Sequence, residues 1–100
     1  MADEENITIK ETKKKSGKRK PLPMYKVLLH NDKVNDFGQV VKVVYQLTPL
    51  KKEECVQRVT EAHETGVSLL LVTHKERAEL YEEQFRSNIP PIKVTIEPDE

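Results

Sequence analysis

The chain has 100 residues, the length of one domain, and its 17 basic and 17 acidic side chains cancel, so overall charge does not favour nucleic acid or an acidic substrate. The apolar run at 67–72 is too short for a bilayer, which needs about 20 residues, and the N-terminus lacks the apolar segment of a secretory signal. The single cysteine, Cys55, excludes an internal disulfide and fits a reducing compartment. We therefore expect a cytoplasmic protein with no membrane partner.

Residues 1–22 are predicted to form a flexible, disordered N-terminal arm. Residues 1–20 carry seven basic against four acidic side chains, and the few apolar residues among them have no partners nearby. Pro21 and Pro23 mark the boundary with a folded domain over 23–98. The basic arm can be interpreted as a solvating tail or as a nucleic-acid arm. It has no aromatic residue for base stacking, so we expect no nucleic-acid partner.

The first predicted strand covers residues 24–30 and alternates, with Tyr25, Val27 and Leu29 on one face. Asn31 and Asp32 follow directly, where the strand must turn. Both residue types favour turns for backbone reasons, which is one interpretation of this pair. The other is that an amide and a carboxylate at the rim of the core bind a positively charged group of a partner.

Two helices should follow this turn. Asp36 and Gln39 form a capping-box-like start to the first, whose apolar face has helical spacing. Thr48, as N-cap, and Pro49, at the first helical position, predict the start of the second. Gly66 is expected to end the second helix in a left-handed conformation.

The remaining elements are a strand, a helix and a strand. The continuous apolar run at 67–72 predicts a central strand. Thr73 and Glu76 predict a capping box for a third helix, which buries Tyr81 and Phe85 among others. The last strand alternates, with three residues pointing inward: Ile92, Val94 and Ile96.

This order predicts an α+β, two-layer fold: β-α-α-β-α-β, with a three-stranded antiparallel sheet and three helices on one face. Motifs for catalysis are absent, because three glycines form no phosphate-binding loop and no nucleophile elbow occurs. The histidines lack the spacing of metal ligands. We expect a binding module, not an enzyme, without cofactor or metal.

The segments MYKVLLHND, VVKVV, EAHETG and THKERAE resemble ClpS, the adaptor of the bacterial Clp protease, over residues 24–96. The resemblance implies a protein that binds substrates whose first residue is bulky and hydrophobic, an N-degron. It implies delivery to an AAA+ unfoldase of the ClpA or ClpC type, for which the flexible N-terminal extension is needed. We expect a monomer. The alternative is a divergent ClpS-like interaction module with altered or lost N-degron specificity.

The resemblance also implies site residues. The site for the substrate amino group falls on Asn31, Asp32 and His63, although His63 can also be interpreted as a helix-end histidine near the last carbonyls. The unfoldase contact falls on Glu76 and Glu79. The apolar pocket falls on six residues: Leu29, Phe37, Val40, Val59, Ala62 and Ile92.

The chain departs from the family pattern at several positions. Lys33 stands where a second Asp is usual, and Phe37 where the family has a Met that gates the pocket. Val59 and Ala62 are smaller than the residues commonly found across the pocket. Tyr81 stands in place of a lysine of the third helix. These departures leave the preferred first residue of the substrate open.

Overall fold

The computed structural model describes residues 22–100. The elements are β2 (Met24–His30), α2 (Phe37–Leu47), α3 (Lys52–Thr65), β3 (Val67–His74), α4 (Lys75–Arg86) and β4 (Val94–Pro98). The predicted α+β fold and element order are confirmed. The predicted arm over residues 1–22 lies, apart from Leu22, outside the described residues.

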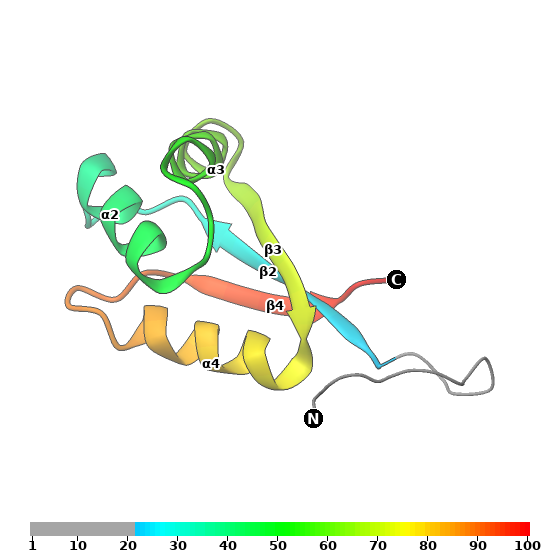
Figure 1. Cartoon of the computed structure of the whole chain (residues 1–100). Helices are drawn as coiled ribbons and strands as arrows, with labels where there is room; N and C mark the ends of the chain where they lie inside the picture. The colour runs from blue at the N-terminus through cyan, green and yellow to red at the C-terminus, as the bar shows by residue number, and fades with distance from the viewer. Residues whose placement is uncertain (1–21) are drawn as a thin grey trace, which may run out of the picture.

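The three strands form one antiparallel sheet in the order β3-β2-β4, so β2 is the central strand (Figure 1). The prediction that residues 67–72 form a central strand was wrong, because β3 lies at an edge. Its burial alternates: Ser68 and Leu70 are buried, whereas Val67 and Leu69 are each 40% exposed. A continuous apolar run suggests burial on both faces, but the helices cover only one face of β3.

α2 begins as predicted. The carboxylate of Asp36 caps the helix by accepting the backbone N–H of Gln39 at 2.8 Å. Val40 and Val44 are buried on the predicted apolar face. Phe37, the first residue of the helix, is 46% exposed. The helix therefore packs from its second turn onward and leaves the Phe37 ring at the surface.

The predicted start of the second helix at Thr48 was wrong. Thr48 ends α2 instead, since its N–H and its hydroxyl both donate to the carbonyl of Val44, at 3.0 and 2.7 Å. α3 starts four residues later, where the N–H of Lys51 donates to Oε1 of Glu54 at 2.9 Å. The far end is as predicted, because Gly66 adopts the left-handed conformation with φ of 99°.

The predicted capping box of Thr73 and Glu76 was also wrong. Thr73 pairs with Tyr25 in the sheet, and β3 continues through His74. His74 is the N-cap of α4 and makes no side-chain capping bond. Thr73, which the local sequence predicts as a helix cap, is therefore part of the sheet instead.

One apolar core joins the sheet to all three helices. Its largest fully buried side chains are Phe85, Leu29 and Leu70. Ile92 and Val94 are buried and Ile96 is partly buried, as predicted, although β4 starts only at Val94. Figure 1 shows α4 alongside the sheet, and α2 and α3 together near the end of β2. Within residues 22–100, no helix has the length and apolar character to cross a membrane.

Candidate functional site

Two backbone hydrogen bonds hold the end of β2 against distant segments. The N–H of His30 donates to the carbonyl of Lys93 at 3.1 Å, and the N–H of Asn31 donates to the carbonyl of Gly66 at 3.0 Å. Gly66 follows α3 directly, and His63 lies in the last turn of that helix. The Asn31–Gly66 bond therefore sets the last turn of α3 beside the loop that begins at Asn31.

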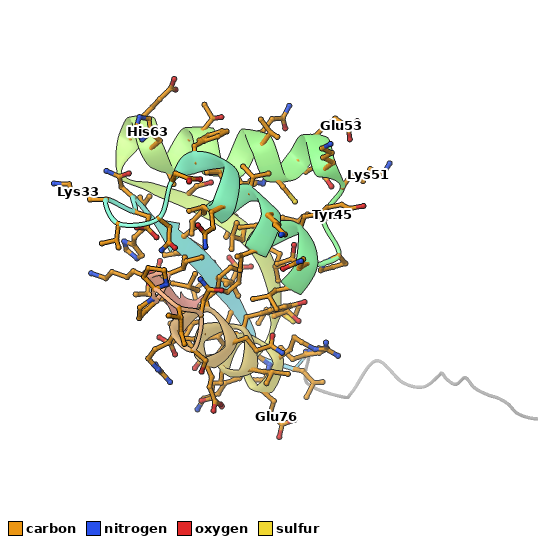
Figure 2. All side chains as sticks on the ribbon, turned by 90° about the vertical axis from the view of Figure 1, so that its left-hand side faces the viewer. Lys33, Tyr45, Lys51, Glu53, His63 and Glu76 are labelled. Atoms are coloured by element: carbon orange, nitrogen blue, oxygen red, sulfur yellow. The ribbon has the colours of Figure 1, made fainter. Side chains whose placement is uncertain are left out.

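A cavity of about 220 Å³ opens at this junction of β2, α2 and α3. Asn31, Asp32 and His63 all line it, so the three polar residues predicted from two distant segments surround one space. Figure 2 shows His63 at the end of α3, on the same side of the molecule as Lys33 in the loop. Five of the predicted apolar residues line the cavity as well: Leu29, Phe37, Val40, Val59 and Ala62.

Ile92 is the one predicted pocket residue that does not line this cavity. It is 1% exposed and belongs to the hydrophobic core. Its backbone N–H donates to the carbonyl of Phe85 at 3.0 Å, which holds it against the end of α4. Its part in the fold is therefore to support the core.

The cavity has an apolar floor and a polar rim. Leu29, Val40, Val59 and Ala62 are each 5% exposed or less, so their side chains form the floor and lower walls. Asn31 and His63 are exposed and Asp32 is half-buried. A ligand could thus reach the polar groups from solvent while placing an apolar side chain inward.

The Asp32 carboxylate organises the loop that carries it. Its Oδ1 accepts the N–H groups of Val34 at 2.7 Å and Asn35 at 2.8 Å, and its Oδ2 accepts the Asn35 amide at 2.8 Å. Burial alone would raise the pKa of Asp32, but the hydrogen bonds from Asn35 and Val34 outweigh it and lower the pKa below the ordinary value of 3.8. The rim therefore carries a fixed negative charge at neutral pH.

Asn35 is a site residue that the sequence interpretation missed. It is 6% exposed, lines the cavity, and points its amide nitrogen at the Asp32 carboxylate and at the carbonyls of Pro90 and Pro91, at 3.3 and 3.4 Å. It thereby ties the acidic loop to the segment before β4. The spacing Asp-x-x-Asn was the available signal, because an Asp side chain at a turn binds backbone N–H groups two and three residues on.

His30 and Asp36 also line the cavity without having been predicted there. The His30 imidazole shares a 2.7 Å hydrogen bond with the Thr95 hydroxyl. Burial, and then the nearby charge of Lys93, lower the pKa of His30 below its ordinary 6.5. His30 is therefore a neutral group in this wall at pH 7.

The residues predicted to contact an unfoldase lie elsewhere. Glu76 and Glu79 are exposed near the start of α4. Figure 2 shows Glu76 at the end of the molecule opposite to His63 and Lys33. Tyr81 is only 6% exposed and packs in the core, so its side chain is not on this surface. Among residues 22–100, no cluster of His, Cys, Asp or Glu could hold a metal ion.

The chain matches one protein-family model over residues 20–95, described as ATP-dependent Clp protease adaptor protein ClpS. It is 38% identical over 87 residues to an adapter protein ClpS of Gloeobacter violaceus, covering 86% of this chain and 91% of the relative. It is 42% identical over 84 residues to an adapter protein ClpS of Synechococcus elongatus, covering 83% of this chain and 86% of the relative.

A solved structure shares the fold. Agrobacterium tumefaciens ClpS2 bound to L-phenylalaninamide superposes with a TM-score of 0.73 at 22% identity, covering 79% of this chain and 100% of that chain.

Proposed function

Because this chain belongs to the ClpS family of Clp protease adaptor proteins, we propose that its cavity binds the first residue of proteins that are to be degraded. The free amino group is held at the rim by Asn31, Asp32 and His63, and a bulky hydrophobic side chain fills the space behind. The observation that carries the proposal is the joining of these three polar groups with an apolar floor in one cavity.

The rim suits an α-ammonium group, which carries a positive charge and has three N–H donors. A carboxylate, an amide oxygen and a neutral imidazole nitrogen can each accept one of these hydrogens. Hydrogen bonds to charged groups contribute about 1.5–3 kcal/mol each. Acetylation of the amino group removes both the charge and the donors, so the rim distinguishes a free N-terminus from a blocked one.

The floor suits one apolar side chain. The cavity of about 220 Å³ is smaller than the roughly 300–1,000 Å³ of sites for drug-sized ligands. Burying a Leu or Phe side chain contributes about 1.5–3 kcal/mol. The phenylalaninamide bound to the Agrobacterium protein has a free amino group and one such side chain. We propose that Leu, Phe, Tyr or Trp is the accepted first residue.

The partner that receives the substrate is proposed to be a Clp AAA+ unfoldase of the ClpA or ClpC type. Glu76 and Glu79 are both exposed on α4, and Figure 2 shows Glu76 at the end of the molecule opposite to His63, which would leave the bound substrate accessible. Because Tyr81 is buried, we assign the unfoldase contact to Glu76 and Glu79 and do not include Tyr81 in it. The chain would act as a monomeric binding protein in the cytoplasm, not as an enzyme.

The proposed function is tested by fluorescence anisotropy on peptides that differ only in residue one, each with a free or an acetylated N-terminus. We expect free peptides beginning with Leu, Phe, Tyr or Trp to bind with micromolar or tighter affinity, and acetylated ones to lose about tenfold or more. Equal binding of both forms would remove the amino-group site.

Absence of all binding would favour the divergent module, in which Lys33 and Phe37 have altered the pocket. Recovery of binding by Lys33→Asp with Phe37→Met would then support that alternative. Figure 2 shows Lys33 extending away from the body of the protein, where solvent and salt screen its charge.

The arm over residues 1–22 is proposed to serve delivery and not binding. Deletion of residues 1–20 should leave the peptide Kd unchanged, because the proposed amino-group ligands and the apolar floor of the cavity come from residues between Leu29 and His63. We expect the same deletion to abolish degradation of an N-degron reporter by the unfoldase and its protease. A weaker peptide Kd after the deletion would contradict this division of roles.

A further inference from the structure

A second hollow lies on the outer side of α2, and the first turns of this helix contribute residues both to it and to the proposed cavity. This second hollow has a volume of about 360 Å³ and is lined by five residues: Gly38, Val41, Lys42, Tyr45 and Lys52. We call this surface the α2–α3 groove. Phe37 and Val40 line the cavity, and Gly38 and Val41 are the next residues along α2. The two hollows thus share the first turns of one helix.

Exposed apolar side chains lie in the groove and on the two helices that border it. Tyr45 is 54% exposed and Phe37 46%. Val56 of α3, one turn after Lys52, is 39% exposed. In Figure 2, Tyr45 and Lys51 lie near one end of the α2–α3 pair and His63 lies at the other. The apolar surface therefore runs from the rim of the cavity toward the loop that joins the two helices.

Gly38 has no role in the fold that requires glycine. Its φ is not in the left-handed region, and an added Cβ would meet only Oδ1 of Asp36, at an ordinary 3.7 Å. A glycine in a helix weakens it by about 0.5–1 kcal/mol relative to alanine. What Gly38 does provide is open space on the floor of the groove, directly beside Phe37.

The groove is also basic. Lys42 and Lys52 line it, and neither forms an ion pair with a carboxylate of the described part of the chain. Glu53 and Glu54 are neighbours of Lys52 in the first turn of α3, and Glu54 accepts the backbone N–H of Lys51. The two ammonium groups remain available to an acidic side chain of a ligand.

We propose that the α2–α3 groove binds the substrate chain that follows the gripped first residue, and favours an acidic side chain at about position five. This inference rests on the proposed function of the cavity. Phe37 and Tyr45 are eight residues apart, or about 12 Å along the helix at 1.5 Å per residue. An extended chain advances about 3.3 Å per residue, so roughly four residues span the distance from Phe37, at the cavity, to Tyr45.

The test compares L-phenylalaninamide with hexapeptides that begin with Phe, carry Asp or Lys at position five, and have serine elsewhere. Calorimetry on the full-length chain should give tighter binding of the Asp peptide than of the Lys peptide, by about fivefold to tenfold, the size expected for two partly exposed charge pairs. Lys42→Glu combined with Lys52→Glu should invert this order while leaving the Kd of phenylalaninamide unchanged. Arg77→Glu with Arg86→Glu, on α4, is the charge-matched control and should not invert it.

A second pair of variants tests the floor. Gly38→Gln should weaken the Asp hexapeptide several-fold and spare phenylalaninamide, whereas Gly38→Ala should preserve both and raise the melting temperature slightly. If phenylalaninamide binds but the hexapeptides bind no differently from it or from each other, the groove proposal is wrong and the proposed function of the cavity stands. Failure of the wild type to bind either ligand would overturn the proposed function together with the groove.

Discussion

Asp32→Asn is expected to lower the affinity for a peptide with a free hydrophobic N-terminus by about 10- to 100-fold, the loss of one charge-assisted hydrogen bond. The carboxylate is the only ionised acceptor among the three predicted amino-group ligands, and its hydrogen bonds keep it charged. The affinity for the acetylated peptide should not change. Fluorescence anisotropy with both peptides gives the comparison.

Asp36→Asn is the matched control for this prediction. Asp36 also lines the cavity, but its carboxylate caps α2, and Asn serves as an N-cap about as well as Asp. A loss as large in Asp36→Asn as in Asp32→Asn would mean that overall negative charge, not a positioned acceptor, attracts the amine.

Asp32→Asn should also change the stability of the fold, by an amount that depends on pH. The pKa of Asp32 is lowered on folding, so its charged form stabilises the fold at pH values above the ordinary 3.8. This contribution is lost as the pH falls through the lower folded value. The difference in melting temperature between wild type and Asp32→Asn should therefore be present at pH 6 and shrink below about pH 4.

Asn35→Asp is expected to destabilise the protein by about 2–4 kcal/mol at pH 7 and to weaken peptide binding as well. The substitution replaces a buried donor with a carboxylate that faces the Asp32 carboxylate and the carbonyls of Pro90 and Pro91. Burial of an unpaired charge beside a like charge is among the costliest single changes. Thermal and urea unfolding measure the loss.

Acid should reverse part of this loss. The new carboxyl group would have a raised pKa in the folded state, because both its burial and the nearby negative charge disfavour ionisation. Its protonated form can donate to Asp32, so stability relative to wild type should improve as the pH falls from 7 to 5. Asn88→Asp gives a control, since the Asn88 amide also donates to the carbonyl of Pro90 but, among residues 22–100, forms no hydrogen bond with a carboxylate. An equal destabilisation in both variants would assign the effect to the proline segment alone.

The sequence predicted the fold where local signals and packing agree. β2 was predicted because its alternation matches a strand with one buried face, and Gly66 because a left-handed helix end needs glycine. Thr48 and Thr73 were wrongly predicted as N-caps because threonine is a common capping residue. In the structure, Thr48 ends the preceding helix by a hydrogen bond to Val44, and Thr73 pairs with Tyr25 in the sheet. β3 was placed at the centre because apolar residues on an uncovered face look the same in sequence as buried ones.

The candidate site was predicted partly from residues and partly from family resemblance. Residue types alone marked Asn31 and Asp32 as candidate groups for a positive charge. The position of His63 beside them depends on the Asn31–Gly66 hydrogen bond, which no local pattern reveals. The family resemblance placed Ile92 in the pocket, whereas the alternation of the last strand shows only that its side chain points inward, not which part of the interior it reaches. Asn35 was missed because asparagines in turns are common and its partners at Pro90 and Pro91 are distant in sequence.

In the proposed site, the backbone bond between Asn31 and Gly66 makes recognition of the amino group independent of recognition of the side chain. It joins main chain to main chain, so exchanging side chains in α2 or α3 can reshape the apolar walls without moving the acceptors apart. Selectivity for one first residue over another could then be re-engineered at Phe37, Val59 or Ala62 as an isolated module. The requirement for an unblocked terminus would persist through every such redesign.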